Sequence, residues 1–349
     1  MSARPFVHPS AHPSAPIAAI FGASGPELLA SERAFFAEAD PWGFILFGRN
    51  VREPDQLRRL IDGMRGSVGR RAPVLIDQEG GRVARLGPPH WRHWGPVRRL
   101  FDGEDEEAAL EAVRLRYRII AAELAALGID VDCAPLLDVA APEGHGVIGD
   151  RALGETPDAV ARRGRAVCNG LRAGGVLPVV KHLPGHGRAP TDSHLGLPLV
   201  TAPRQALEAA DFAAFRPLAG EALGMTAHVV YAAIDRQSCA TLSAAAIDVI
   251  RREIGFDGLL MTDDLSMGAL SGPMGARAAA ALAAGCDMIL HCNGDMAEMR
   301  AVAAAVPRLS GAAARRAARA EAERGPAEEI DLAAAEARYA ELTGESAHA

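Results

Sequence analysis

Eight short apolar runs, alternating with stretches of helical periodicity, constrain the fold of this 349-residue chain more than any other feature. The runs are rich in Val, Ile and Leu and are mostly uncharged until their C-terminal ends. This pattern is typical of strands buried on both faces of a parallel sheet. We therefore predict strands at residues 17–21, 43–47, 73–77, 129–135, 177–182, 224–228, 259–262 and 288–291.

Helical patterns fill the intervals between these runs. In the clearest one, at 104–127, Val113, Tyr117, Ile120 and Leu124 recur every three or four residues before a glycine that fits a C-terminal cap. Alternating strands and helices predict an α/β fold, a single (β/α)8 barrel of the TIM type, with a doubly wound sheet as the alternative. The other helices are expected at 26–39, 53–66, 157–173, 203–215, 243–254 and 275–284.

No internal repeat and no long linker divides the chain. We therefore expect one barrel domain over residues 16–349, preceded by a loose N-terminal tail at 1–15. The Ala-rich segment 295–340 is expected to form helices that pack on the outside of the barrel.

Composition excludes several classes of protein. The net charge of -7 argues against a nucleic-acid partner. No run reaches the ~18 apolar residues of a membrane span, and residues 1–15 lack the pattern of a secretory signal. The five cysteines are odd in number and form no CxxC pair, which favours reduced thiols and a cytoplasmic location. We expect a monomer without a metal or another cofactor.

Ionisable residues follow several of the predicted strands directly. In a parallel barrel the carboxyl ends of all strands meet at one rim, where active sites form. We therefore expect a single polar pocket there. Its carboxylates, cations and imidazoles, together with few aromatic rings, suit a small, hydroxyl-rich ligand. The segments that build it are 77–85, 181–182, 226–228, 263–267 and 291–293.

The segment 179–194 is the most distinctive of these. Lys181 is the only lysine in the chain, and an ammonium is a compact point charge that the planar arginine fork does not replace. His182, His186 and His194 lie in the same segment, the last of them two residues after Asp192. Such residues also fit a metal site, but the Gly and Pro between them favour a mobile loop over a fixed set of ligands.

These motifs resemble the signature of family 3 glycoside hydrolases, and more closely that of the single-domain β-N-acetylhexosaminidases of bacterial peptidoglycan recycling. The similar segments occur in family order within about residues 17–295. Small departures lie at Ala152, Leu183, Arg188 and Pro190, the last two in a loop that varies. The segments are Asp77-Gln-Glu-Gly-Gly-Arg-Val-x-Arg85, Gly149-Asp-Arg151, Lys181-His-x-Pro-Gly-His186-Gly with Asp192-Ser-His194, and Thr262-Asp-Asp-Leu-Ser-Met267.

The resemblance implies a retaining exo-β-N-acetylglucosaminidase, which needs a nucleophile and a proton donor at the scissile bond. Asp263 is the implied nucleophile, which would form a covalent glycosyl intermediate, with Asp264 as the competing choice from the sequence alone. His194 is the implied acid/base. Asp192 would orient the His194 ring and favour its protonated form.

The remaining polar residues would hold the sugar, with Asp77 accepting hydrogen bonds from hydroxyl groups and Lys181 donating them. His186 is expected to be structural, and Met267 or Val229 is expected to supply an apolar niche for the acetamido group. The implied substrate-binding residues are Asp77, Arg85, Arg151, Lys181 and His182.

The same motifs leave several functions open. A β-N-acetylglucosaminide phosphorylase or a β-glucosidase would use the same scaffold, and a neutral histidine as acid/base would not repel phosphate as a carboxylate does. A metal-dependent barrel hydrolase is a further alternative. A non-catalytic sugar-binding barrel would need the hydroxyl-binding residues but neither Asp263 nor His194. The link to peptidoglycan fragments comes from the resemblance alone.

Overall fold

The structure, a computed structural model, describes residues 15–344, so most of the predicted tail at 1–15 lies outside the described residues. Eight strands pair in parallel in the order β11-β9-β7-β6-β3-β2-β1-β12. A bridge between Met261 and Met288 joins the two edges, so the sheet closes into the predicted barrel. The strands are β1 (Ile17–Gly22), β2 (Pro41–Leu46), β3 (Val74–Ile76), β6 (Val131–Asp132), β7 (Leu177–Leu183), β9 (Leu223–Thr226), β11 (Leu259–Met261) and β12 (Ile289–His291).

The strands bury both of their faces because successive side chains point to opposite sides of the sheet. In β1, Ala18 and Ile20 join the cluster that fills the barrel. Their neighbours Ala19 and Phe21 join the larger cluster between the sheet and the helices. This two-sided burial explains why the strands have continuous apolar sequences without a polar face.

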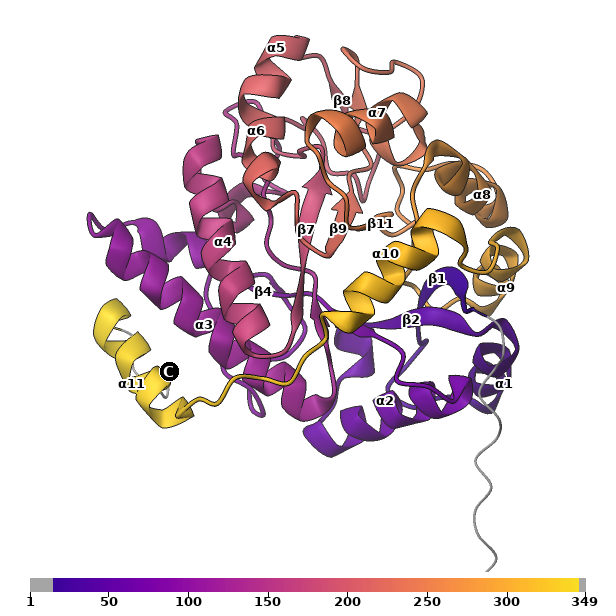
Figure 1. The fold of residues 1–349 in the computed structure, drawn as a ribbon, viewed down its shortest axis with the longest axis horizontal. Helices are drawn as coiled ribbons and strands as arrows, with labels where there is room; N and C mark the ends of the chain where they lie inside the picture. Colours follow the sequence, from indigo (N-terminus) through magenta and orange to yellow (C-terminus); the bar gives the residue numbers. More distant parts are fainter. Residues whose placement is uncertain (1–14, 345–349) are drawn as a thin grey trace, which may run out of the picture.

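The helices form a ring around the barrel (Figure 1). Asp105 caps α3, Ser243 caps α7, and Gly128 ends α3 in the left-handed conformation. Among the described residues, no helix is long and apolar enough to cross a membrane. The helices are α1 (Ala30–Ala39), α2 (Pro54–Val68), α3 (Glu106–Leu127), α4 (Pro157–Ala173), α5 (Arg204–Ala206), α6 (Phe212–Phe215), α7 (Ala244–Asp248), α8 (Met274–Ala284), α9 (Met296–Ala305), α10 (Gly311–Ala322) and α11 (Leu332–Thr343).

Two predicted helices are interrupted. The segment predicted at 203–215 consists of α5, a π turn at Leu207–Asp211 and α6. The segment predicted at 243–254 consists of α7 followed by a second π turn at Val249–Glu253. Each π turn spans only five residues inside a helical segment, which is too short for the apolar periodicity of the sequence to reveal it.

Other elements differ from the prediction at their ends. Helix α1 begins at Ala30 rather than residue 26 because the Glu32 carboxylate accepts hydrogen bonds from the backbone N–H groups of Ser24 and Leu29. The strand predicted at 129–135 is reduced to β6, since Pro135 lacks an N–H group for a regular ladder. Two small strand pairs at the rim were not predicted, namely β4 (Gln78–Gly80) with β5 (Val83–Ala84), and β8 (Leu199–Val200) with β10 (Val230–Tyr231).

Helix α10 lies across the amino end of the barrel, and the helices predicted at 295–340 are present (Figure 1). Ala317 and Ala320 of α10 pack against the cluster inside the barrel. Just after α10, Arg324 pairs with Asp130 at 2.7 Å. The Asp130 carboxylate also accepts from Arg65 at 3.0 Å and from the backbone N–H of Val74 at 2.8 Å. One buried carboxylate therefore joins the C-terminal segment to helix α2 and to strand β3.

Replacing Asp130 with alanine should lower the free energy of unfolding by about 3 kcal/mol, because Arg65 and Arg324 would lose a buried counter-ion. Asp257 is the matched control, since it pairs with Arg316 and Arg319 of α10 but is 71% exposed. Asp257→Ala should cost less than about 1 kcal/mol. Urea denaturation measures both. Equal losses in the two variants would contradict this view of the α10 junction.

Candidate active site

A pocket of ≈ 230 Å³ opens at the carboxyl ends of the strands. That volume is below the ~300–1,000 Å³ of pockets for drug-sized ligands, so it suits one small unit such as a single sugar ring. Asp192 does not line the pocket but contacts a residue that does. The seven other predicted site residues all line it, namely Asp77, Arg85, Arg151, Lys181, His182, His194 and Asp263.

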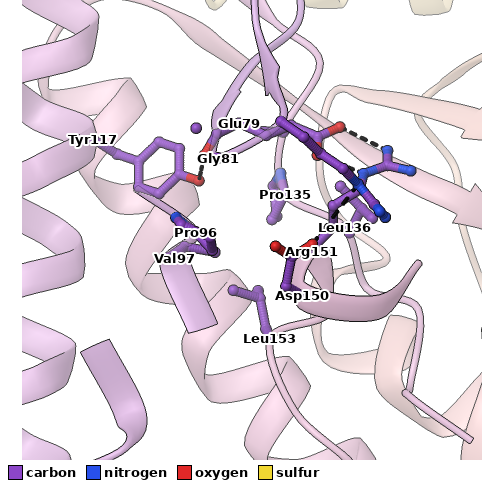
Figure 2. Close-up of a pocket in the computed structure, with 13 residues that line it drawn as sticks. Glu79, Gly81, Pro96, Val97, Tyr117, Pro135, Leu136, Asp150, Arg151 and Leu153 are labelled. Carbon is purple, nitrogen blue, oxygen red and sulfur yellow. Dashed lines mark hydrogen bonds and ion pairs between the residues drawn. The ribbon is translucent and has the colours of Figure 1, made fainter. Parts of the chain in front are cut away.

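Five side chains of alternating charge form a row along one side of the pocket, and all but Glu79 line it. We call them the charge row: Arg85, Asp77, Lys181, Glu79 and Arg151. Arg85 Nη2 lies 2.9 Å from Asp77 Oδ2, and Lys181 Nζ lies 3.0 Å from Asp77 Oδ1. Lys181 Nζ also lies 2.7 Å from Glu79 Oε1. Both oxygens of Glu79 accept from Arg151, each at 2.9 Å (Figure 2).

The charge row keeps Asp77, Glu79 and Lys181 ionised in spite of their burial. Burial alone would raise the pKa of Asp77, but Lys181 and Arg85 hold it far below its ordinary value. Burial would lower the pKa of Lys181, yet Asp77 and Glu79 raise it well above its ordinary value. The pKa of Glu79 is lowered as well, because Lys181 and Arg151 outweigh its burial. The pocket therefore presents fixed charges for hydroxyl groups.

Glu79 is a member of this site that the sequence reasoning did not single out. It is buried and, unlike Asp77, does not line the pocket. Its backbone carbonyl accepts a hydrogen bond of 2.8 Å from the Tyr117 hydroxyl, which anchors β4 from the side of α3 (Figure 2). The alternation of β-structure was the available signal, because Asp77 and Glu79 are two residues apart in one motif.

Asp138 is a second residue that was missed. Its Oδ2 lies 2.7 Å from His182 Nδ1, and its Oδ1 accepts from the backbone N–H groups of His182 and His186. Burial would raise the pKa of Asp138, but the two histidines lower it to about 2. The ionised Asp138 therefore fixes the His182 ring, whose other nitrogen is left for a ligand in the pocket. The sequence did contain a signal for Asp138, because it is an ionisable residue that follows the apolar run after β6.

Asp263 lies two residues after the end of β11 and lines the pocket. Its burial would raise its pKa, but His228 and His182 favour the carboxylate and lower the value below the ordinary one. The backbone N–H of Asp264 donates to Asp263 Oδ1 at 2.8 Å and acts in the same direction. Asp263 is therefore a desolvated but ionised carboxylate, which is the form a nucleophile needs.

Asp264 has a different role from that of its neighbour. Its two oxygens accept from the backbone N–H and the hydroxyl of Ser266, and Oδ1 also accepts from the backbone N–H of Cys292 at 3.1 Å. The side chain therefore ties the loop after β11 to the end of β12. This contact set makes Asp264 a loop anchor.

His194 and Asp192 form a close pair on the loop after β7. His194 Nδ1 lies 2.8 Å from Asp192 Oδ1, and the backbone N–H of His194 donates to the same oxygen at 2.9 Å. Burial would raise the pKa of Asp192, but the hydrogen bonds from His194 lower it. The His194 side chain is 62% exposed at the mouth of the pocket. The other ring nitrogen of His194, Nε2, is not the one that contacts Asp192.

The expectations for His186, Met267 and Val229 have different outcomes. His186 is buried, its Nε2 lies 3.1 Å from Ser193 Oγ, and burial lowers its pKa to about 4, which fits the predicted structural role. Met267 lines the pocket, but Val229 belongs to the hydrophobic core, so the expectation for Val229 is wrong. Among residues 15–344, no three His, Cys, Asp or Glu side chains are grouped as metal ligands.

Asp132 lies buried behind the charge row, where its Oδ1 accepts from the backbone N–H of Gln78 at 2.9 Å. Burial raises its pKa to about 7, and the nearby Asp77 and Glu79 carboxylates add to this shift. The folded state therefore holds a proton that the unfolded state releases near its ordinary pKa of 3.8. Stability contributed by this proton is present below about pH 4 and is lost as the pH rises through about 7.

Asp132→Asn keeps the acceptor for Gln78 but removes the titration. The free energy of unfolding of the natural chain, minus that of the variant, should therefore fall between pH 4 and pH 7, which chemical denaturation at several pH values measures. Other titrating groups are common to both proteins and cancel in the difference. A difference that does not change with pH would contradict the assignment.

Known proteins resemble this chain over most of its length. The model of the glycosyl hydrolase family 3 N-terminal domain matches residues 30–324. The beta-hexosaminidase of Alkalilimnicola ehrlichii is 42% identical over 286 residues, covering 78% of this chain and 80% of the relative. NagZ from Neisseria gonorrhoeae has a TM-score of 0.83 at 32% identity, covering 95% of this chain and 98% of that one.

A second structure of the Neisseria gonorrhoeae protein contains N-trifluoroacetyl-D-glucosamine. It has a TM-score of 0.83 at 30% identity and covers 95% of this chain and 99% of that one. The family model spans all strands that carry site residues, from β2 to β12. The (β/α)8 barrel and the motifs at its rim lead to the same assignment, and the chain belongs to glycosyl hydrolase family 3.

Proposed function

We propose that this protein is a retaining exo-β-N-acetylglucosaminidase, which removes terminal β-linked N-acetylglucosamine from the non-reducing end of its substrate. The observation that carries the proposal is the partly buried, ionised Asp263 in a pocket that also contains the Asp192-oriented His194. Its relatives named beta-hexosaminidase, and the neisserial relative with a glucosamine derivative, support the choice of sugar.

In the first step Asp263 attacks the anomeric carbon of the sugar. A C–O bond forms between the carboxylate and this carbon, while the bond to the leaving oxygen breaks. Nε2 of His194 gives its proton to that oxygen, and Asp192 stabilises the positive ring before transfer. The low pKa of Asp263 keeps the nucleophile free of a proton in this step.

In the second step water replaces the enzyme at the anomeric carbon. The neutral His194 now accepts a proton from water, whose oxygen attacks from the face that the leaving group has vacated. Asp263 leaves as a carboxylate, and two inversions give retention of configuration. Exposure of His194 at the pocket mouth is consistent with access of both the departing alcohol and the incoming water.

The charge row and His182 would bind the sugar hydroxyl groups. Asp77 accepts hydrogen bonds, whereas Lys181, Arg85 and Arg151 donate them. Each of these groups is already held by an opposite charge, so little side-chain entropy is lost when the sugar binds. Met267 supplies apolar surface for the acetamido methyl group.

The setting of the reaction follows from the same proposal. We propose that the protein acts on fragments of peptidoglycan in the cytoplasm and that it does so as a monomer. In this proposal residues 16–349 form one catalytic domain, preceded by a short tail at 1–15. All five cysteines are free and buried, as is typical of proteins in reducing compartments. The net charge of -7 is consistent with a carbohydrate rather than a nucleic-acid partner.

Phosphorolysis is the second candidate, because the proposed acid/base at His194 is an imidazole. A neutral ring near the anomeric carbon leaves room for a phosphate anion, which a carboxylate in that place would repel. Incubation with an aryl β-N-acetylglucosaminide in the presence and absence of phosphate separates the two reactions. Hydrolysis gives N-acetylglucosamine in both cases, whereas phosphorolysis gives the sugar 1-phosphate only when phosphate is present.

The protein should hydrolyse an aryl β-N-acetylglucosaminide faster than the matching β-glucoside, since only the former fills the acetamido niche. Asp263→Asn should lower kcat by at least ~10³-fold, because the amide is a poor nucleophile. Asp248→Asn is a control at an exposed position of α7 and should retain full activity. A natural-level rate in the Asp263 variant, or a preference for the glucoside, would refute the proposal.

A further inference from the structure

The loop after β7 has a buried part and an exposed part. Residues 184–189, which we call the root, are buried apart from the partly exposed Arg188 side chain. Residues 190–197, which we call the tip, contain Asp192 and His194 and include Leu195, which is 86% exposed. The proposed acid/base therefore lies on the less packed half of the loop.

Contacts from the segments that follow β6 and β9 hold the root. The Tyr231 hydroxyl donates to the carbonyl of Gly185 at 2.7 Å, and the backbone N–H of His145 donates to that of Ala189 at 2.7 Å. A Cβ on Gly187 would lie 1.8 Å from the carbonyl oxygen of Val139, so only glycine fits there. The root is thus built against the loops that follow β6 and β9.

Arg188 adds the side-chain contacts of the root. Its Nε donates to Asp211 Oδ2 at 2.8 Å, and its Nη1 donates to Glu143. Asp211 is 1% exposed and ends the π turn between α5 and α6. It also packs on Gly185, where a Cβ would approach Asp211 Cβ to 2.9 Å. Arg188 therefore joins the root to the π turn at Leu207–Asp211 and to the loop that follows β6.

The tip is held mainly by weaker contacts to the loop that follows Asp263. The backbone N–H of Gly268 donates to the carbonyl of His194 at 3.2 Å, and that of Ala269 donates to the carbonyl of Ser193 at 3.1 Å. The position of His194 thus depends on where the tip leaves the root and on how it rests on the nucleophile loop.

We propose that Arg188 is a positioning residue for the acid/base: by joining Asp211 and Glu143 it fixes the point from which the tip carries His194 to the leaving oxygen. The inference rests on the proposed function and deepens it. A fixed root shortens the segment that can move, so His194 spends more of its time in the productive place. Two carboxylates on different elements require the planar fork of arginine, which the ammonium of lysine does not reproduce.

Leaving groups of different acidity test this role in the full chain. The value of kcat/KM reports the step in which the glycosidic bond breaks, and only a poor leaving group such as phenol needs a proton from the acid. Arg188→Met should lower kcat/KM by ~10-fold for the phenyl β-N-acetylglucosaminide but by less than ~2-fold for the 2,4-dinitrophenyl one. Arg204→Met is the matched control, because Arg204 also joins two carboxylates but lies on α5. It should keep both values.

A double-mutant cycle tests the connection to Asp211. Arg188→Met leaves a buried carboxylate without its cation, whereas the double variant with Asp211→Asn removes that charge and keeps the fold intact. If Arg188 acts through Asp211, the losses of the two single variants will not add up in the double variant. Hydrogen exchange of the backbone at 190–197 should become faster in Arg188→Met and stay unchanged in Arg204→Met.

Equal losses for the two leaving groups, additive effects in the cycle, or unchanged exchange of the tip would overturn the role of Arg188. His194→Ala separates this failure from that of the proposed function. That variant should lose far more activity on the phenyl than on the dinitrophenyl substrate. If it does, and Arg188→Met does not, only the positioning role is wrong. If His194→Ala shows no such difference, the acid/base assignment itself is wrong, and the role of Arg188 with it.

Discussion

The contact of Lys181 with two carboxylates is the interaction on which the rest of the site depends. Its ammonium lies 3.0 Å from Asp77 and 2.7 Å from Glu79, and it is almost fully buried. A buried cation is unfavourable unless it is paired, and each carboxylate is in turn paired with an arginine. The alternating row therefore keeps Asp77, Glu79 and Lys181 ionised beside the pocket. No single member can be removed without leaving an unbalanced neighbour.

The barrel explains how these charges come together. Asp77 follows β3 and Lys181 lies in β7, with β6 between them in the sheet. Parallel strands that start at one end of a barrel finish at the other, so residues distant in sequence share one rim. Asp263, after β11, reaches the same pocket from the far side of the closed sheet. The strand ends position the proposed nucleophile and groups proposed to bind the sugar, while the proposed acid/base lies on a loop.

Sequence reasoning reached the residues whose signal is local. The strand-end positions of Asp77, Lys181 and Asp263 follow from apolar runs, and the Asp192–His194 pair is only two residues apart. Glu79 and Asp138 were missed because their importance comes from partners that are distant in sequence: the contact of Asp138 with His182 spans 44 residues.

The limits of the fold prediction have the same physical origin. Periodicity located all eight strands of the barrel. It did not reveal the two π turns, because each spans only five residues inside a helical segment. The turn that ends at Asp211 shows the consequence, since it places the carboxylate that receives Arg188. Arg188, which the sequence placed only in a variable loop, thereby has Asp211 as a defined partner.

The most direct test of the account is to trap the covalent intermediate. In His194→Ala, the 2,4-dinitrophenyl β-N-acetylglucosaminide should still react with the nucleophile, but water would lack its base, so the glycosyl-enzyme should accumulate. Mass spectrometry of the intact chain should then show the addition of one N-acetylglucosaminyl group, and peptide fragmentation should place it on Asp263. Steady turnover without an adduct, or an adduct on Asp264, would contradict the account.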